Sequence, residues 1–494
     1  MESTPTQKLT PPLLPVKSWT SYGSLVAGPL VFFVLAFAGL VPFEPKIQLV
    51  IGVAGWIMVW WITEAVPMPV TAFLPLVLFP TLGILDLPTT AANYTNPTVL
   101  LFLSGFIFAL AMERHHLHTR IALHIVKLVG TSSQRIVLGF MVATAFVSMW
   151  VNNTAAALLV LPIATSVLTL LEADFREAGL QAEFRKFSTS LLLGLAYCAS
   201  IGGIATTIGT PTNAVLLGYL RELYQIDVSF TGWFVVGFPL AVLMLIATYL
   251  MLVKVLFRVD VSSLPNASEI IDDKITALGP VTFQEYAVSS LFILTAAGWI
   301  LRPVLIDRFG LGFLNDTIIG MAGALLLFSV PDPSSKTGLL FDWTSMSKLP
   351  WGILFVIGGG LALAKTLESS GIIKIIGEAV ASTGTRNAWY LMIALTGVVL
   401  LLKLFIANTA LATIALPMAF GIADSTGINP ILLGAPVTFA ASFAFILPMS
   451  TPPNAIVLTT GQVTIKDMML AGSLLAIIGF LLLIAAAKAY AWMI

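Results

Sequence analysis

The sequence predicts an all-α polytopic membrane protein, with about 11 transmembrane helices plus two re-entrant hairpins that form inverted repeats. Hydrophobic residues make up 58% of the 494 residues and charged residues only 10%, whereas roughly 25% of the residues in a soluble domain are charged. Apolar runs such as 24–41, 283–300 and 468–494 are long enough to cross about 30 Å of hydrocarbon as helices. In addition, the motif Asn-Thr-Ala occurs twice inside apolar segments, at 153–155 and 408–410.

The apolar runs, taken in order, define the expected crossings. They are placed at residues 23–42, 47–62, 65–85, 97–112, 187–221, 230–257, 283–303, 313–331, 350–364, 430–461 and 468–493. Two further stretches, 134–171 and 388–423, each have room for two short helices with an Asn-Thr pair near the middle. We interpret both as re-entrant hairpins, because irregular backbone at membrane depth is tolerated only where it lines a cavity or packs inside protein.

The distribution of Lys and Arg favours an N-terminus on the cytoplasmic side. On that path the inner loops carry fourteen of these residues and the outer loops seven, in agreement with the positive-inside rule. Residues 1–22 are then a cytoplasmic tail and residues 258–282 a cytoplasmic loop. All four histidines lie in one basic stretch, 115–124. A metal site is conceivable there, but we favour an interfacial helix.

Two landmarks of the first half recur in the second half. Asn153-Thr154 recurs as Asn408-Thr409 after 255 residues, and Thr210-Pro211 recurs as Thr451-Pro452 after 241 residues. By the predicted path, the first hairpin enters from the cytoplasm and the second from outside. The repeats are therefore inverted, an arrangement typical of transporters that bind substrate between the repeats at helix breaks.

The predicted breaks place polar groups suited to an anion and a cation. The start of a helix exposes unpaired N–H groups with the positive end of the helix dipole behind them, worth roughly 0.3–1 kcal/mol toward an anion. Helices that begin at Thr154, Thr409, Asn213 and Asn454 would point four such ends at one site. Backbone carbonyls freed at the breaks suit sodium by the same logic.

Other classes of function fit the sequence less well. The zero net charge argues against a nucleic acid partner. An intramembrane enzyme would need a paired acid, a His-Glu-x-x-His helix or a Ser-His pair at membrane depth, and the apolar segments contain none of these, so we expect no enzymatic activity. A channel would not need an anion site between inverted hairpins.

The chain resembles the divalent anion/sodium symporter family. The resemblance is carried by Trp-Trp-Ile-Thr-Glu-Ala-Val-Pro at 60–67, by Gly202-Gly203, and by the two Asn-Thr tips and Thr-Pro elements above. It covers nearly the whole chain after about residue 24. It implies a homodimer whose scaffold domain supports a transport domain that moves like an elevator. The scaffold would comprise residues 23–133 and 283–387, and the transport domain residues 134–257 and 388–494, including the hairpins and the broken helices 187–221 and 430–461.

The resemblance also implies site residues. Substrate would be bound by Asn153, Thr154, Asn408, Thr409, Thr451, Pro452, Thr210 and Pro211. A first sodium ion would be held by Ser148, Asn152, Asn153 and the Gly209 carbonyl. A second would be held by Asn408 and by backbone near Ile406 and Ser450.

The second tip departs from the family pattern. Ala407 and Asn152 replace the serines that usually precede the two Asn-Thr pairs, and Lys403-Leu404 stands where the family often has Thr-Glu. A lysine at the bilayer centre costs roughly 2.5–3.5 kcal/mol, so it favours a cavity over lipid. Our hypothesis is that the Lys403 ammonium substitutes for the second sodium ion. The alternative is that Lys403 extends to the outer interface or pairs with a carboxylate elsewhere.

These observations together predict a secondary active transporter in a bacterial-type inner or plasma membrane. Its expected substrates are divalent organic anions, C4-dicarboxylates such as succinate, malate and fumarate, carried by sodium-coupled symport. No Arg lies at either tip to grip a third carboxylate. The alternatives are a sodium-independent or proton-coupled exchanger of dicarboxylates or tricarboxylates, and a sulfate carrier of the same fold.

Overall fold

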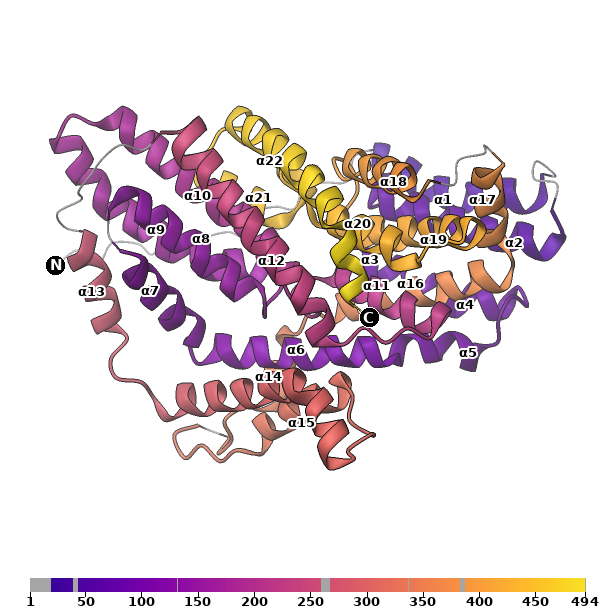
Figure 1. Cartoon of the computed structure of the whole chain (residues 1–494), viewed down its shortest axis with the longest axis horizontal. Helices are drawn as coiled ribbons and strands as arrows, with labels where there is room; N and C mark the ends of the chain where they lie inside the picture. Colours follow the sequence, from indigo (N-terminus) through magenta and orange to yellow (C-terminus); the bar gives the residue numbers. More distant parts are fainter. Residues whose placement is uncertain are drawn as a thin grey trace, which may run out of the picture.

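The computed structural model of the protein describes residues 19–38, 43–130, 132–258, 267–335, 337–382 and 387–493. Nearly all of the predicted tail 1–22 and the segment 259–266 of the predicted loop 258–282 lie outside these ranges. Within them the chain is helical, and only an isolated bridge joins Pro331 and Leu339. The all-α polytopic fold is thereby confirmed (Figure 1).

The helices fall into two halves. The first half contains α1 (Trp19–Phe37), α2 (Pro45–Thr63), α3 (Met68–Thr71), α4 (Leu74–Thr81), α5 (Leu87–Ala92), α6 (Pro97–Arg114), α7 (Leu117–Val129), α8 (Ser133–Ser148), α9 (Asn153–Glu177), α10 (Gln181–Gly203), α11 (Pro211–Tyr224) and α12 (Phe230–Tyr249). The second half contains α13 (Ala267–Ala277), α14 (Phe283–Phe309), α15 (Asp316–Ser329), α16 (Trp351–Ser369), α17 (Ile372–Ala381), α18 (Ala388–Leu402), α19 (Asn408–Thr426), α20 (Pro430–Ser442), α21 (Pro452–Leu458) and α22 (Ile465–Ala485). A π-helical turn, Leu250–Leu256, continues α12, and short 3-10 turns occupy Asn93–Thr95, Trp343–Lys348, Pro448–Ser450 and Ala486–Met493.

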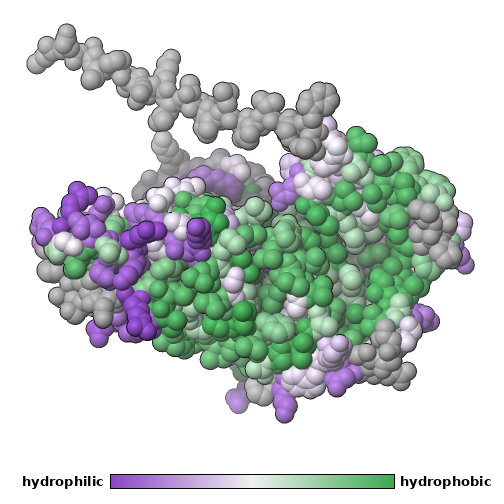
Figure 2. Space-filling view, turned by 90° about the horizontal axis from the view of Figure 1, so that it is seen from above, coloured by the Kyte–Doolittle hydropathy of each residue, from purple (hydrophilic) through white to green (hydrophobic). Residues whose placement is uncertain are grey.

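The outer surface matches a hydrocarbon environment. Eight helices in the described ranges are long and apolar enough to cross a membrane, and several shorter apolar helices accompany them. Large apolar side chains such as Leu294, Leu325 and Leu481 are about 60% exposed. Figure 2 shows a broad hydrophobic surface across the middle of one face, with hydrophilic residues gathered toward its edges. Soluble monomers rarely expose broad contiguous apolar surfaces of this kind.

One predicted crossing is wrong in form. We expected a single helix over residues 65–85, but the chain forms the short helices α3 and α4 there. Pro69 and Pro75 each stand in the first turn of one of these helices, and Pro80 lies near the end of α4. Proline has no N–H to donate, and its ring clashes with the preceding turn of a helix. The prolines therefore break this segment into short helices. The short helices α5 and α17 were not predicted at all.

The two predicted hairpins are present and occupy opposite sides of the molecule. In Figure 1, α8 and α9 lie to the left, and α18 and α19 lie to the right. The first hairpin turns between Ser148 and Asn153, and the second between Leu402 and Asn408. Each therefore reverses direction at its Asn-Thr motif, although α9 continues to Glu177, beyond the expected end at 171.

The two predicted broken helices are also present, and equivalent asparagines brace them. Between α10 and α11, the Asn213 side-chain amide donates to the carbonyls of Gly203 (3.1 Å) and Thr206 (2.7 Å). Between α20 and α21, the Asn454 amide donates to the carbonyls of Ala444 (2.8 Å) and Leu447 (3.1 Å). The acceptors stand ten and seven residues before the asparagine in both cases. This shared spacing is direct structural support for the internal repeat.

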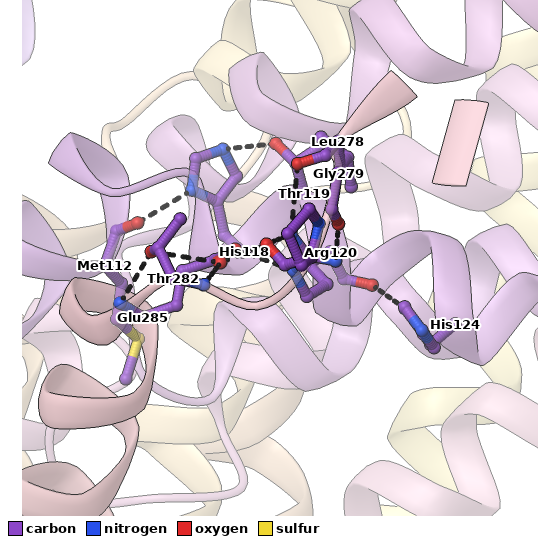
Figure 3. A network of polar contacts seen from close by, with 10 residues as sticks. Met112, His118, Thr119, Arg120, His124, Leu278, Gly279, Thr282 and Glu285 are labelled. Carbon is purple, nitrogen blue, oxygen red and sulfur yellow. Dashed lines mark hydrogen bonds and ion pairs between the residues drawn. The ribbon is translucent and has the colours of Figure 1, made fainter. Parts of the chain in front are cut away.

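The helix α7, which was expected as an interfacial helix, ties the first half of the chain to the second. The Arg120 guanidinium lies 2.7 Å from the Glu285 carboxylate at the start of α14, and it also donates to the carbonyls of Leu278 and Gly279 (Figure 3). Glu285 in turn accepts from the Thr282 N–H in a capping box. The ion pair is largely shielded from solvent, with 12% and 5% of the two side chains exposed. It anchors the segment that precedes the first hairpin.

The histidines of this segment make structural contacts. Burial lowers the pKa of His118, so its ring is neutral near pH 7 and carries one proton. That proton lies on Nδ1, which donates to the Met112 carbonyl at 3.2 Å, while Nε2 accepts from the Thr119 hydroxyl (Figure 3). His124 donates to the Arg120 carbonyl in the same way. In the described ranges, no three His, Cys, Asp or Glu side chains lie close enough together to hold a metal ion.

Replacing Arg120 by Met should lower the free energy of unfolding by about 3 kcal/mol, because the buried Glu285 carboxylate would lose its counter-charge. The double variant Arg120→Met/Glu285→Gln should recover most of this loss. Thermal unfolding of the purified protein in detergent measures both. Arg176→Met is the matched control, since Arg176 is 70% exposed in its pair with Glu172 and such surface pairs contribute at most about 1 kcal/mol. Equal destabilisation by both arginine variants would contradict the assigned role of the buried pair.

Candidate functional site

A cavity of about 510 Å³ lies where the two hairpin tips meet the two helix breaks. All eight predicted substrate-binding residues line it, namely Asn153, Thr154, Thr210, Pro211, Asn408, Thr409, Thr451 and Pro452. Asn152 and Ser450, from the predicted sodium sites, line it as well. Residues from four segments far apart in the sequence thus converge at one place. Two hydroxyls connect the breaks directly, since Thr212 Oγ1 and Ser442 Oγ lie 2.7 Å apart.

The first-hairpin tip presents the N-terminus of α9 to the cavity. Asn152 caps this helix, because its side-chain oxygen accepts from the Ala155 N–H at 2.9 Å. The first two N–H groups of the helix, those of Asn153 and Thr154, have no acceptor within the helix. This tip therefore offers backbone donors to an anion, and the structure gives the Asn152 amide a capping role beside its predicted place near sodium.

The second-hairpin tip offers more donors than the first. Ala407 occupies the cap position of α19, and its methyl side chain cannot accept a hydrogen bond. The N–H groups of Asn408, Thr409 and Ala410 therefore start the helix without a side-chain acceptor at the cap. The change from the usual serine to alanine removes a competitor for the N–H groups that face the cavity.

The expectation of four donating helix ends is wrong for the two ends at the helix breaks. The helix α21 begins with Pro452 and Pro453, neither of which carries an N–H, and the Asn454 N–H is bonded to the Thr451 carbonyl at 3.2 Å. The equivalent helix α11 begins with Pro211, the Asn213 N–H is bonded to the Thr210 carbonyl at 3.1 Å, and Thr212 does not line the cavity. The hairpin helices α9 and α19 therefore supply the backbone N–H groups at the cavity, and the two breaks contribute mainly side-chain and carbonyl oxygens.

Three of the four residues of the predicted first sodium site, Ser148, Asn153 and Gly209, lie close together. Ser148 Oγ is buried, 3.1 Å from Asn153 Oδ1 and 2.5 Å from the Ala199 carbonyl oxygen. A hydroxyl has a single proton, and donation to Ala199 leaves the Ser148 and Asn153 oxygens facing each other with free lone pairs. Gly203 adjoins both Asn153 Oδ1 and the Gly209 carbonyl, because a Cβ added at Gly203 would lie 2.3 and 3.2 Å from them.

Buried oxygens without a hydrogen-bond partner accompany this site. They belong to Ser200, Thr207, Thr210 and Asn213 in the segment that surrounds the first break. A buried polar atom without a partner is costly, so each such atom needs an explanation. A hard cation such as sodium prefers hydroxyl, amide and carbonyl oxygens. The donor set around the first break therefore fits sodium. Our sequence interpretation missed Ser200 and Thr207, although the density of small polar residues in 200–213 was a usable signal.

The predicted second site is different because a lysine reaches it. Lys403 is 1% exposed, and its ammonium donates to the carbonyls of Ile406 and Ser450, both at 2.8 Å. These are the backbone positions that the family resemblance assigned to a second sodium ion. Lys403 does not extend to an interface and makes no ion pair with a carboxylate in the described ranges. The alternative of an interfacial or carboxylate-paired lysine is therefore wrong.

Glu64 is the only charged residue that lines the described cavity. It ends α2 in a left-handed conformation, with φ of 47° and ψ of 37°, and its side chain is exposed. We did not predict it as a site residue, although it belongs to the 60–67 motif. No Arg or Lys lines the cavity, so the direct contacts to an anion there would come from helix ends, hydroxyls and amides.

The chain is similar to known proteins over nearly its whole length. Residues 16–494 match the family model described as the sodium:sulfate symporter transmembrane region. The sodium-dependent dicarboxylate transporter SdcS of Staphylococcus aureus strain USA300 is 38% identical over 469 residues, which cover 93% of this chain and 89% of that protein. The SdcS of strain NCTC 8325 has the same identity and coverage.

Two solved structures share the fold at low sequence identity. The YdaH transporter of Alcanivorax borkumensis has a TM-score of 0.55 and 14% identity, with 82% of this chain and 87% of that chain covered. MtrF of Neisseria gonorrhoeae, described among antimetabolite efflux pumps, has a TM-score of 0.52 and 16% identity, with 81% and 83% covered. At this identity the likeness concerns the fold alone.

Proposed function

Because this chain belongs to the sodium:sulfate symporter family, we propose that it is a secondary active transporter of divalent organic anions. The proposed substrates are C4-dicarboxylates such as succinate, malate and fumarate, and the proposed coupling ion is sodium. The observation that carries the proposal is the cavity between the repeats, with the starts of α9 and α19 at its wall and no cationic side chain among its lining residues. The SdcS relatives are named sodium-dependent dicarboxylate transporters, which supports both the proposed substrate class and the proposed coupling ion.

Binding of the anion follows from the geometry of the tips. The carboxylates would accept from the N–H groups at the starts of α9 and α19, where the helix dipoles favour negative charge. The hydroxyls of Thr154, Thr409 and Thr451 would complete the oxygen contacts. Each carboxylate oxygen can accept more than one hydrogen bond. The two carboxylates of a C4-dicarboxylate could therefore accept hydrogen bonds from donors on both hairpins.

Sodium would contribute the positive charge that the cavity wall lacks. We place one ion against Ser148, Asn153 and the Gly209 carbonyl, with the unpartnered oxygens around the first break nearby. Because Asn153 both borders this site and lines the cavity, occupancy by sodium would fix the hairpin tip in the conformation that receives the anion. Sodium and substrate binding would therefore be linked.

The movement we propose is an elevator motion within a homodimer. The transport domain would consist of 134–257 and 388–494, and the scaffold of 23–133 and 283–387. The buried Arg120–Glu285 pair supports this division, because it fixes α7 to the scaffold helix α14 immediately before the first hairpin. Bonds between the two breaks, such as Thr212 to Ser442, would let both halves of the transport domain move as one unit.

Uptake of labelled succinate into proteoliposomes tests the function. The purified protein should take up succinate when sodium is present and not when potassium replaces it, and unlabelled malate and fumarate should compete. Vesicles loaded with succinate and vesicles without it are both needed, so that exchange and net uptake are seen separately. Competition by sulfate or citrate but not by malate would contradict the dicarboxylate assignment, and equal uptake in potassium would contradict sodium coupling.

A further inference from the structure

The ammonium of Lys403 lies in a pocket built for a cation. Lys403 follows the last residue of α18, and its side chain turns into the protein, where it is 1% exposed. Its two acceptors come from different segments, Ile406 from its own hairpin tip and Ser450 from the turn before α21. Carbonyls that converge from an unwound tip and a helix break are the ligands that transporters of this architecture offer to sodium.

The internal repeat shows what Lys403 replaces. The offset of 255 residues that relates the two hairpin tips pairs Lys403 with Ser148, and the offset of 241 that relates the breaks pairs Ser450 with Gly209. In the first repeat a neutral hydroxyl and a carbonyl are therefore available to a free cation. In the second repeat a covalently attached cation already occupies the equivalent position.

Of the four unpartnered oxygens around the first break, those of Thr210 and Asn213 have counterparts in Thr451 and Asn454, and the other two do not. Ser200 and Thr207, whose buried hydroxyls have no partner, correspond by the offset of 241 to Ala441 and Pro448. Neither of the latter has a side-chain oxygen. Sodium in the second site would lack these ligands and would also have to displace an ammonium from two hydrogen bonds. The residues present do not fit a second sodium ion.

No protein carboxylate balances the charge of Lys403 in the described part of the chain. A buried charge without a partner is unfavourable. Ser450, which accepts one of its hydrogen bonds, lines the cavity proposed for the anion. The bound dianion is therefore the group that can compensate this charge.

We propose that the Lys403 ammonium is a built-in cation that replaces the second sodium ion, so that a single sodium ion accompanies each divalent anion and exchange of anions is faster than net transport. This inference rests on the proposed function and specifies its coupling. One sodium ion and one ammonium neutralise a dianion, so the loaded transport domain carries no net charge at the site. After sodium and substrate leave, the ammonium stays behind.

The retained charge affects the return of the empty carrier. Movement of an uncompensated charge through the low-dielectric part of a membrane protein is costly. The empty transport domain should therefore return slowly, whereas a domain reloaded with anion and sodium returns neutral. Exchange avoids the slow step, and net uptake includes it.

The wild-type protein in proteoliposomes tests the proposal without any substitution. The sodium dependence of succinate uptake should show a Hill coefficient of about one. Efflux of labelled succinate into medium that contains succinate and sodium should be at least about tenfold faster than efflux into sodium medium without succinate. A Hill coefficient of two or more, or equal rates of exchange and net efflux, would overturn the proposal.

The variant Lys403→Ser, which copies the residue at Ser148, tests the role of the charge. In this variant, the rate of net succinate efflux should lie within about twofold of the rate of succinate exchange. The KM for succinate should rise about tenfold, because a positive charge near the anion is lost. Lys374→Ser is the matched control, since Lys374 is 80% exposed on α17, and it should keep wild-type values. A Lys403→Ser protein with unchanged KM and exchange preference would also overturn the proposal. Absence of succinate transport by the wild-type protein in either mode would instead contradict the proposed function.

Discussion

Replacing Asn153 by Ala should abolish transport, with kcat/KM for succinate lowered at least about 100-fold, while the protein remains folded. Asn153 is 8% exposed and lines the cavity, and its side-chain oxygen lies 3.1 Å from Ser148 Oγ and next to Gly203. Alanine removes that oxygen from the proposed sodium site and leaves Ser148 without its neighbour. The helix itself keeps its cap, because Asn152 supplies it.

The equivalent variant Asn408→Ala should have a similar effect on transport, since Asn408 lines the cavity at the second tip. Asn387→Ala is the matched control. Asn387 caps α18 and does not line the cavity, so its loss should cost about 1 kcal/mol of stability and leave KM unchanged. Thermal unfolding in detergent and proteoliposome uptake measure the two effects separately. Wild-type uptake by Asn153→Ala or Asn408→Ala would refute the assignment of the site.

Replacing Gly203 by Ala should raise the sodium concentration for half-maximal uptake by about tenfold or more. The added Cβ would lie 2.3 Å from Asn153 Oδ1 and 3.2 Å from the Gly209 carbonyl oxygen. Because real Cβ atoms do not approach oxygens so closely, the Asn153 amide must shift away from the proposed ion. The measured quantity is succinate uptake as a function of sodium concentration at saturating succinate.

The neighbouring variant Gly202→Ala should behave differently. Its Cβ would lie 2.1 Å from the Ala145 carbonyl oxygen, so the clash involves backbone of α8 and should cost about 3 kcal/mol of stability. At Gly312 an added Cβ meets nothing within 4 Å, and Gly312→Ala should match the wild type in both respects. If Gly203→Ala lowered stability as Gly202→Ala does, with sodium dependence unchanged, the sodium site would be misplaced.

The main features of the fold were predictable because the membrane restricts the possible structures. Long apolar runs must become helices in hydrocarbon, and the repeated Asn-Thr and Thr-Pro motifs marked the hairpin tips and breaks. The segment 65–85 was mispredicted because hydropathy does not register the four prolines that divide it. The amphipathic helix α17 was missed because it is too short and too polar on one face to resemble a crossing.

The location of the site could be predicted from the sequence, but the contacts within it could not. The repeated motifs and the family resemblance were sufficient to predict eight substrate residues, all of which line one cavity. The motifs could not show that Pro453 removes a donor from the fourth helix end, since that follows only once the start of α21 is known. Nor could they show where the Lys403 side chain points, because its direction depends on Ser450, which lies 47 residues away.

The two asparagines that bridge the helix breaks are the same in both repeats, whereas the residues at the two hairpin tips differ. Asn213 and Asn454 bridge the two breaks through carbonyls at the same spacing, ten and seven residues before each asparagine, although different side chains stand at the neighbouring hairpin tips. Ser148 and Lys403 occupy equivalent positions in the two repeats, so a hydroxyl and an ammonium are both compatible with this fold. If Lys403 has the role proposed above, a single substitution at either position would change which ions the carrier requires.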